Sequence, residues 1–224
     1  MSKHWERDLD NLQRHLMALA ASVEEAIFKG TRSLQERNPS LAREVVAGDS
    51  AIDQEENQIE NECLKMLALH QPVAVDLRRI IAALKINTDL ERMADLSVNI
   101  AERALSLAEL PRIAVPEKLQ GMTDLTTFMV RQSLDAFVML DAEQARRVIR
   151  IDDEVDRYNR EIIAELIRYM QGSPEQVPAL LAFFSAVRQL ERIADHATNI
   201  AEDVVYLIEG EIIRHHPMLL SEGA

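Results

Sequence analysis

The feature that most constrains this chain is a segment that it contains twice. Residues 90–102 read LERMADLSVNIAE and residues 190–202 read LERIADHATNIAE, so nine of thirteen positions are identical. The likeness extends towards the N-terminus, where a shift of 103 places Asp49 on Asp152. The shift falls to 100 after that, which indicates a connection three residues shorter in the second copy, as loops tolerate. A tandem repeat of this size predicts two structural units of one kind.

Each copy consists of three long stretches with the apolar spacing of an amphipathic helix. In the first stretch, residues at i, i+3 and i+4 spacing form one apolar side: Leu9, Leu12, Leu16, Leu19, Val23 and Ile27. We expect helices over about 8–37, 39–70, 73–107, 117–140 and 142–172, and a sixth that ends at Glu209. Short capping signals separate them: Asn38-Pro39, Gln71-Pro72, Asp141 with Gln144 in a near capping box, and Gly210.

These stretches predict an all-α fold of two tandem three-helix bundles with an elongated shape. Only 4% of residues are aromatic and six are glycine, and no segment has the alternating period of a strand. Helices of this length suit bundles, in which each buries an apolar stripe against two neighbours. We expect a first bundle over residues 1–110, a linker at 111–116 that contains two prolines, a second bundle over 117–210 and a tail at 211–224.

The duplicated helices gather acidic side chains. At 100° per residue, Glu91, Asp95, Asn99 and Glu102 form one narrow stripe, and the second copy repeats it with Glu191, Asp195, Asn199 and Glu202. The preceding helix of each copy contains an i, i+4 pair, Asp49 with Asp53 and Asp152 with Asp156. If these neighbouring helices pack antiparallel, the chain lengths on either side of the turn bring both pairs to a similar depth. Four carboxylates would then face one another in each bundle.

Such a group of like charges needs a compensating interaction, because the carboxylates repel one another. A metal ion or small metal cluster is one candidate, since hard and borderline cations bind carboxylate oxygens. The candidate ligands are Asp49, Asp53, Glu91, Asp95, Asp152, Asp156, Glu191 and Asp195, with Asn99, Glu102, Asn199 and Glu202 as supporting ligands. The alternatives are ion pairs to Arg92, Arg192, Arg78 or Arg79, or a solvated helix face.

The sequence shows no catalytic constellation. It lacks HExxH, a glycine-rich phosphate loop, GxSxG and a Cys–His pair, and no histidine follows a glutamate by three residues as in di-iron bundles. His196 follows Asp195 but lies about 100° round the helix, which favours a packing or surface role. We therefore expect no enzyme, and an all-oxygen site that serves binding, structure or sensing.

Composition excludes several other classes. A net charge of −13 argues against nucleic acid, which requires clustered Lys and Arg. No apolar run approaches the length of a membrane span, and the N-terminal MSKHWERDLD does not resemble a signal peptide. The single cysteine, Cys63, excludes an internal disulfide and is expected to be a buried apolar residue. We expect a cytoplasmic protein.

The sequence also resembles the PhoU family of phosphate-signalling regulators over nearly its whole length. The resemblance rests on QPVAVDLRRIIAALKI, DLERMADLSVNIAERA and VRQLERIADHATNIAEDVVYLIEG. At Ala94 and Ala194 this chain differs from the commonest family form, which has glycine there. The resemblance implies multinuclear iron or zinc clusters at E(D)xxxD motifs, which correspond to the eight acids named above; manganese or magnesium is a further possibility.

The resemblance also implies a function. It describes a homodimeric negative regulator of phosphate uptake that contacts the ATPase of a phosphate ABC transporter and a phosphate-responsive sensor histidine kinase. Such a protein reaches the membrane only through its protein partners. The competing hypotheses are a metal-dependent hydrolase or oxidase, and a metal-storage or structural scaffold. The tail contains His215 and His216, for which a frayed chain end and a metal or partner contact are both open.

Overall fold

The computed structural model describes residues 3–210, and these form six long α-helices without a strand. The helices are α1 (Lys3–Glu36), α2 (Pro39–His70), α3 (Val75–Leu107), α4 (Leu119–Met139), α5 (Ala142–Gly172) and α6 (Val177–Glu209). One 3₁₀ turn, η1 (Pro174–Gln176), precedes α6 and was not predicted. The all-α prediction is confirmed, and the tail histidines lie outside the described residues.

The predicted capping signals end the helices for the expected reasons. The side chain of Asn38 accepts hydrogen bonds from the backbone N–H groups of Ser40 and Leu41 at the start of α2. Gly210 ends α6 with a φ of 77°, the left-handed conformation that glycine adopts without strain.

The near capping box at the start of α5 forms only in half. The Asp141 carboxylate accepts from the backbone N–H of Gln144 at 2.9 Å, as predicted. The side-chain amide of Gln144 donates instead to the backbone and side-chain oxygens of Gln132 on α4. That side chain therefore ties two helices together rather than completing the cap.

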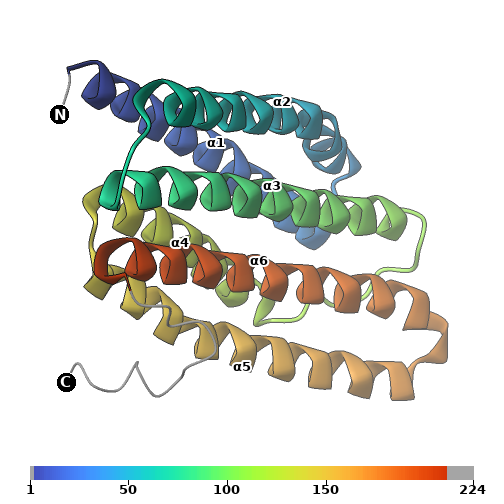
Figure 1. Cartoon of the computed structure of the whole chain (residues 1–224). Coiled ribbons are helices and arrows are strands. Elements are labelled where there is room, and N and C mark those ends of the chain that lie inside the picture. Colours follow the sequence, from blue (N-terminus) through green and yellow to red (C-terminus); the bar gives the residue numbers. More distant parts are fainter. Residues whose placement is uncertain (1–2, 211–224) are drawn as a thin grey trace.

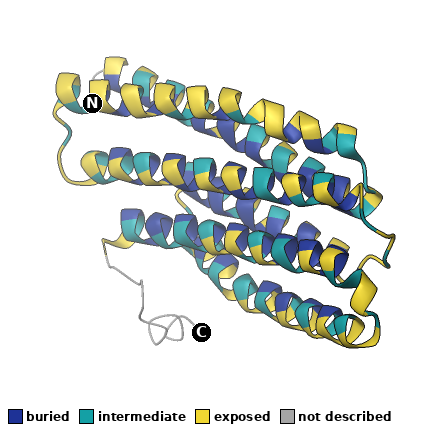
Figure 2. Cartoon of the chain, turned by 90° about the vertical axis from the view of Figure 1, so that its right-hand side faces the viewer, coloured by how far each residue is buried: buried dark blue, intermediate teal, exposed yellow. Residues whose placement is uncertain are grey.

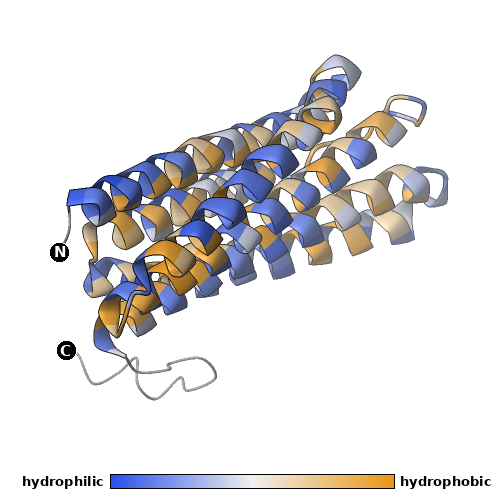
Figure 3. Cartoon of the chain, turned by 45° about the horizontal axis from the view of Figure 1, so that its top comes forward, coloured by the Kyte–Doolittle hydropathy of each residue, from blue (hydrophilic) through white to orange (hydrophobic). Residues whose placement is uncertain are grey.

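The six helices lie in two layers (Figure 1). Helices α2, α3, α6 and α5 lie side by side in that order, and α1 and α4 lie behind them. The first three helices pack against one another, as do the last three, and α3 packs extensively against α6 across the two bundles. Exposed residues follow the outer sides of the helices and buried residues the inner sides (Figure 2), with hydropathy distributed in the same way (Figure 3). The bundles are thus joined along their central helices.

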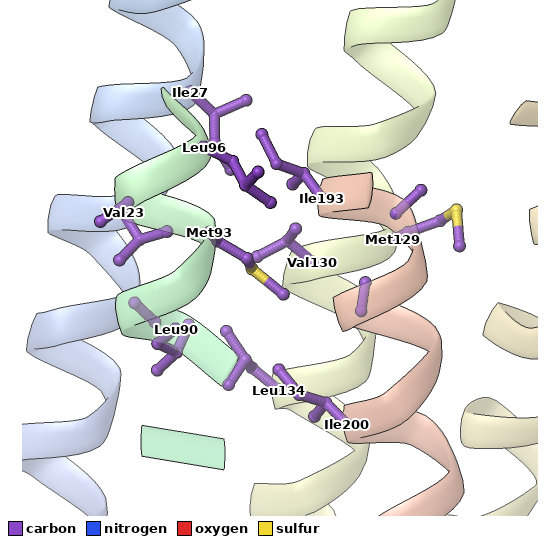
Figure 4. Close-up of a cluster of buried hydrophobic side chains, with 14 of the residues drawn as sticks. Val23, Ile27, Leu90, Met93, Leu96, Met129, Val130, Leu134, Ile193 and Ile200 are labelled. Atoms are coloured by element: carbon purple, nitrogen blue, oxygen red, sulfur yellow. The ribbon is translucent and has the colours of Figure 1, made fainter. Parts of the chain in front are cut away.

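A single apolar core runs through both bundles. Figure 4 shows side chains from four helices meeting there, among them Val23 of α1, Met93 of α3, Val130 of α4 and Ile193 of α6. All four are completely buried, so this contact excludes water from the junction between the repeats. The predicted linker at 111–116 lies between the end of α3 and the start of α4. The apolar core, however, is shared by the helices on both sides of this linker.

The lone cysteine belongs to this core. Cys63 on α2 is fully buried, and burial raises the pKa of its thiol to about 12. A thiol in such surroundings stays protonated and unreactive. This confirms its predicted role as a small apolar residue.

Candidate metal centres

The first set of facing acids, which we call the first acidic groove, comprises Asp49 and Asp53 on α2 and Glu91 and Asp95 on α3. Asp49 and Asp53 are one helical turn apart on α2, and Glu91 and Asp95 are one turn apart on α3. Burial raises the pKa of the Asp49 carboxyl, and the charges of Asp53 and Asp95 raise it further. The Asp95 contribution shows that the two helices bring their acids together, as predicted.

Glu91 shows the same effect from the other side of the groove. Burial raises the pKa of its carboxyl first, followed by the charges of Asp95, Glu56 and Asp53. Arg92, the next residue, opposes this increase only as the last and smallest of these influences. The groove therefore collects negative charge with little compensation from nearby cations.

Glu56 also belongs to this groove, although it was not among the predicted ligands. Burial raises the pKa of its carboxyl, and the neighbouring charges of Glu60 and Asp53 add to the effect. The buried side chain of Asn87 donates to the backbone oxygen of Glu56 at 2.9 Å and to its carboxylate at 3.2 Å. The spacing in the sequence could have predicted this position, because Glu56 follows Asp53 by three residues and so lies on the same helix face.

The corresponding set in the second repeat, the second acidic groove, comprises Asp152 and Asp156 on α5 and Glu191 and Asp195 on α6. The pKa of the Asp152 carboxyl is raised to about 7, by burial first and then by the charges of Asp195 and Asp156. Burial and Asp156 also raise the pKa of Asp195, and burial and Asp195 raise that of Glu191. The predicted juxtaposition of both pairs is present in this bundle too.

The two grooves differ in their cations. In the second groove, Arg188 lies 3.1 Å from the Glu191 carboxylate and Arg160 lies 3.5 Å from that of Asp156. The repeat places Thr88 and Asn57 at the corresponding positions of the first half. The second groove also has Asn159 where the first has Glu56, so the first groove has more acids and no arginine partners of this kind.

The arginines proposed as an alternative source of compensation do not pair with the groove acids. Within residues 3–210, no ion pair joins Arg92, Arg192, Arg78 or Arg79 to any of the eight candidate ligands. The Nε atoms of Arg78 and Arg79 are buried and have no hydrogen-bond partner. Direct ion pairs from arginine to the eight acids are therefore limited, in the described part of the chain, to those of Arg188 and Arg160 in the second groove, while Arg92 and Arg192 act on Glu91 and Asp195 only through their charge.

The residues present fit a hard or borderline cation by their chemistry. One carboxylate oxygen in each groove is buried without a hydrogen-bond partner, Oδ1 of Asp49 and Oε2 of Glu191. Such atoms are costly to bury and are satisfied by a cation. In the described part of the chain, however, no three His, Cys, Asp or Glu side chains converge in a ready-made metal-binding arrangement. The carboxylates are close enough to repel one another without meeting at one point.

The supporting candidates lie further along the same helices. Asn99, Asn199 and Glu202 are half-buried, and Glu102 is exposed. Asn99 lines a separate hollow between α3 and α6 together with Asp95. A ligand role for these four residues stays a prediction.

His196 has a structural partner outside the grooves. Its Nδ1 atom lies 2.8 Å from the carboxylate of Asp89, which joins α6 to α3 between the two bundles. Lys85 of α3 makes a second link of this kind, with its Nζ 2.9 Å from the buried carboxylate of Asp203. The predicted packing role of His196 agrees with this contact.

None of the described helices is long and apolar enough to span a membrane.

The sequence model of the PhoU domain matches this chain twice, at residues 16–104 and 119–204. A similar protein is the phosphate-specific transport system accessory protein PhoU homolog of Aquifex aeolicus, 41% identical over 93% of this chain and 95% of its own length. The homolog of the same name from Pseudomonas putida is 38% identical over 96% of this chain and 84% of its own length.

Solved structures give the same relationship. The crystal structure of PhoU from Pseudomonas aeruginosa has a TM-score of 0.87 and 37% identity, and the match covers 92% of this chain and all of that one. The phosphate transport system regulatory protein PhoU from Streptococcus pneumoniae also has a TM-score of 0.87, with 32% identity over 93% of this chain and 98% of its own. With six helices of the same fold and a PhoU domain in each repeat, the chain belongs to the PhoU family.

Proposed function

We propose that this chain is a non-catalytic adaptor that restrains phosphate uptake and phosphate-starvation signalling. In this proposal it acts in the cytoplasm, as a homodimer, and links the ATPase of a phosphate ABC transporter to a phosphate-responsive sensor histidine kinase. The observation that supports it most is the family match in both repeats, with relatives whose names place them in phosphate-specific transport systems. The long helices offer extended faces for protein partners.

The acidic grooves are proposed to bind metal ions, with iron, zinc or manganese as candidates. The unpartnered oxygens of Asp49 and Glu191 and the raised pKa values of the groove acids support this. The first groove would be held by Asp49, Asp53, Glu91 and Asp95, with Glu56 beside them. The second would be held by Asp152, Asp156, Glu191 and Asp195. A bound cation would supply positive charge, and the chain's own residues would fix the distance between the paired helices.

A deletion and complementation experiment tests the regulatory role. The gene is deleted in its native organism, and phosphate uptake and expression of a phosphate-starvation reporter are measured in phosphate-rich medium. We expect both to increase and the wild-type chain to restore them. Unchanged uptake and reporter expression after deletion would contradict the proposal. Copurification of the tagged chain with the transporter ATPase, followed by mass spectrometry, checks the physical association.

The same strain tests the grooves. Asp49→Asn with Asp53→Asn removes two charges from the first groove, and we expect weaker complementation. Glu55→Gln with Glu143→Gln removes two exposed charges outside the candidate ligand set and is the matched control. Equal complementation by both double variants would show that regulation does not need the first groove.

A further inference from the structure

The repeated motif contains an arginine for which neither the fold nor the acidic grooves account. Arg92 and Arg192 each follow the glutamate of their repeat. In the described part of the chain, Arg92 makes no hydrogen bond or ion pair, and the Arg192 guanidinium contacts only the side-chain oxygen of Gln189, at 3.5 Å. By contrast, Arg146 makes two short bonds to the Glu209 carboxylate. The guanidinium groups of Arg92 and Arg192 therefore remain available to bind another partner.

The packing of α3 on α6 brings these two arginines to one place. The links Lys85–Asp203 and Asp89–His196 show that the helices run antiparallel, since the residue number rises on α3 as it falls on α6. Under the shift of 100, this register relates the two halves by an approximate twofold axis near Ala94 and Ala194. Both alanines are buried, and their small side chains let the helices approach closely.

A hollow of about 260 Å³ lies beside this crossing, lined by Arg92, Asp95, Leu96, Asn99, Arg192 and His196. It receives one arginine from each repeat, and a water occupies about 30 Å³, so a tetrahedral anion fits with several waters. Guanidinium groups present a planar set of donors that matches the oxygens of phosphate or sulfate. The Asn99 amide and the His196 ring add further polar groups to the wall.

Asp95 is the one carboxylate in this lining, and it also contributes to the first acidic groove. Its charge opposes an anion, while the two arginines favour one. A cation in the groove would neutralise Asp95, and anion affinity would then increase because the two sites are linked. Even without a cation, the formal charge of the arginines and Asp95 together is positive.

We propose that this hollow, on the approximate twofold axis between the repeats, binds a small free oxyanion of the phosphate and sulfate class through Arg92 and Arg192. The proposal deepens the regulatory function and rests on it only for the choice of inorganic phosphate as the natural ligand. The site itself rests on the position of the two arginines. The protein would thereby sense the anion with one group from each half.

Binding of radiolabelled inorganic phosphate to the purified full-length chain, by equilibrium dialysis in EDTA, tests the site. We expect saturable binding that sulfate displaces. Arg92→Gln with Arg192→Gln should weaken it at least tenfold, since each charge-assisted hydrogen bond has about that effect. Arg43→Gln with Arg168→Gln removes the same charge from exposed positions elsewhere and should leave binding within about twofold. Circular dichroism and thermal unfolding confirm that each variant is folded.

Three outcomes would overturn the site. The first is the absence of saturable binding to the wild-type chain, and the second is an equal loss in both double variants, which would show a general charge effect. The third is arginine-dependent binding to phosphatidic acid vesicles without binding of free phosphate, which would make a lipid headgroup the ligand. If phosphate fails to bind while deletion still raises uptake, the site is wrong and the proposed function stands. If phosphate binds and deletion has no effect, the site is supported and the proposed function is wrong.

Discussion

Replacement of Asp152 by asparagine should stabilise the metal-free protein at neutral pH. The Asp152 carboxyl is half-buried beside other acids, and its pKa is about 7 against an ordinary value of 3.8. The folded state therefore binds a proton more tightly than the unfolded state does. Under this linkage the group's contribution to stability is fully present below pH 3.8 and is lost as pH rises towards 7.

The magnitude follows from the shift. One pKa unit corresponds to about 1.4 kcal/mol, so the whole shift sets an upper bound of roughly 4 kcal/mol. Because part of the side chain reaches solvent and the neighbouring acids share the proton, we expect about half of that, ~2 kcal/mol. An asparagine side chain at this position cannot ionise, so the variant should avoid this loss of stability at pH 8.

Urea unfolding in EDTA measures the effect. The wild-type chain and Asp152→Asn are compared at pH 4.5 and pH 8, with Glu55→Gln, at an exposed position of α2, as the control for loss of one charge. We expect the stability gain of Asp152→Asn to be small at pH 4.5 and to reach about 2 kcal/mol at pH 8, while the control changes little at either pH. A variant that is less stable than wild type at pH 8, or a gain that is independent of pH, would show that the ionised Asp152 carboxylate does not destabilise the fold.

Three further predictions concern packing, an ion pair and metal affinity. Gly30→Ala places a Cβ 3.0 Å from the Ser97 backbone oxygen and should reduce the free energy of unfolding by about 1–3 kcal/mol. The control is Gly48→Ala, whose Cβ meets nothing within 4 Å and which should not destabilise α2. Thermal unfolding of both variants measures the difference. Lys85→Met removes the lysine that contacts the buried Asp203 carboxylate and should reduce stability in urea by about 1–3 kcal/mol, with no loss if Asp203 is satisfied by its other contacts. The affinity for Mn²⁺, measured by calorimetry, should fall between pH 7.5 and 5.5 because groove acids with raised pKa values must lose protons to bind it, and affinity that is constant over this range would count against carboxylate ligands.

The helices were predictable because their signals are local. Apolar spacing in α1, the Asn38-Pro39 cap and Gly210 each depend on a few neighbouring residues. The facing of Asp49 and Asp95 was predictable too, since two antiparallel helices of matched length leave little choice of register.

Features that depend on packing between the repeats could not be predicted in this way. Nothing in the sequence indicates that α3 and α6 share a core, or that Asp89 meets His196 across more than 100 residues. The sequence did contain the difference in arginine partners between the two grooves, because Thr88 and Asn57 occupy the positions that correspond to Arg188 and Arg160. Its importance became clear only when the structure placed those two arginines beside the second groove.

Metal binding by the acidic grooves can be observed directly by anomalous diffraction from crystals of this chain grown with Mn²⁺, Fe²⁺ or Zn²⁺. We expect a metal peak in each acidic groove, one between Asp49 and Asp95 and one between Asp152 and Asp195, within bonding distance of carboxylate oxygens. Grooves without a peak at saturating metal, with arginine side chains turned over the acids, would contradict this prediction.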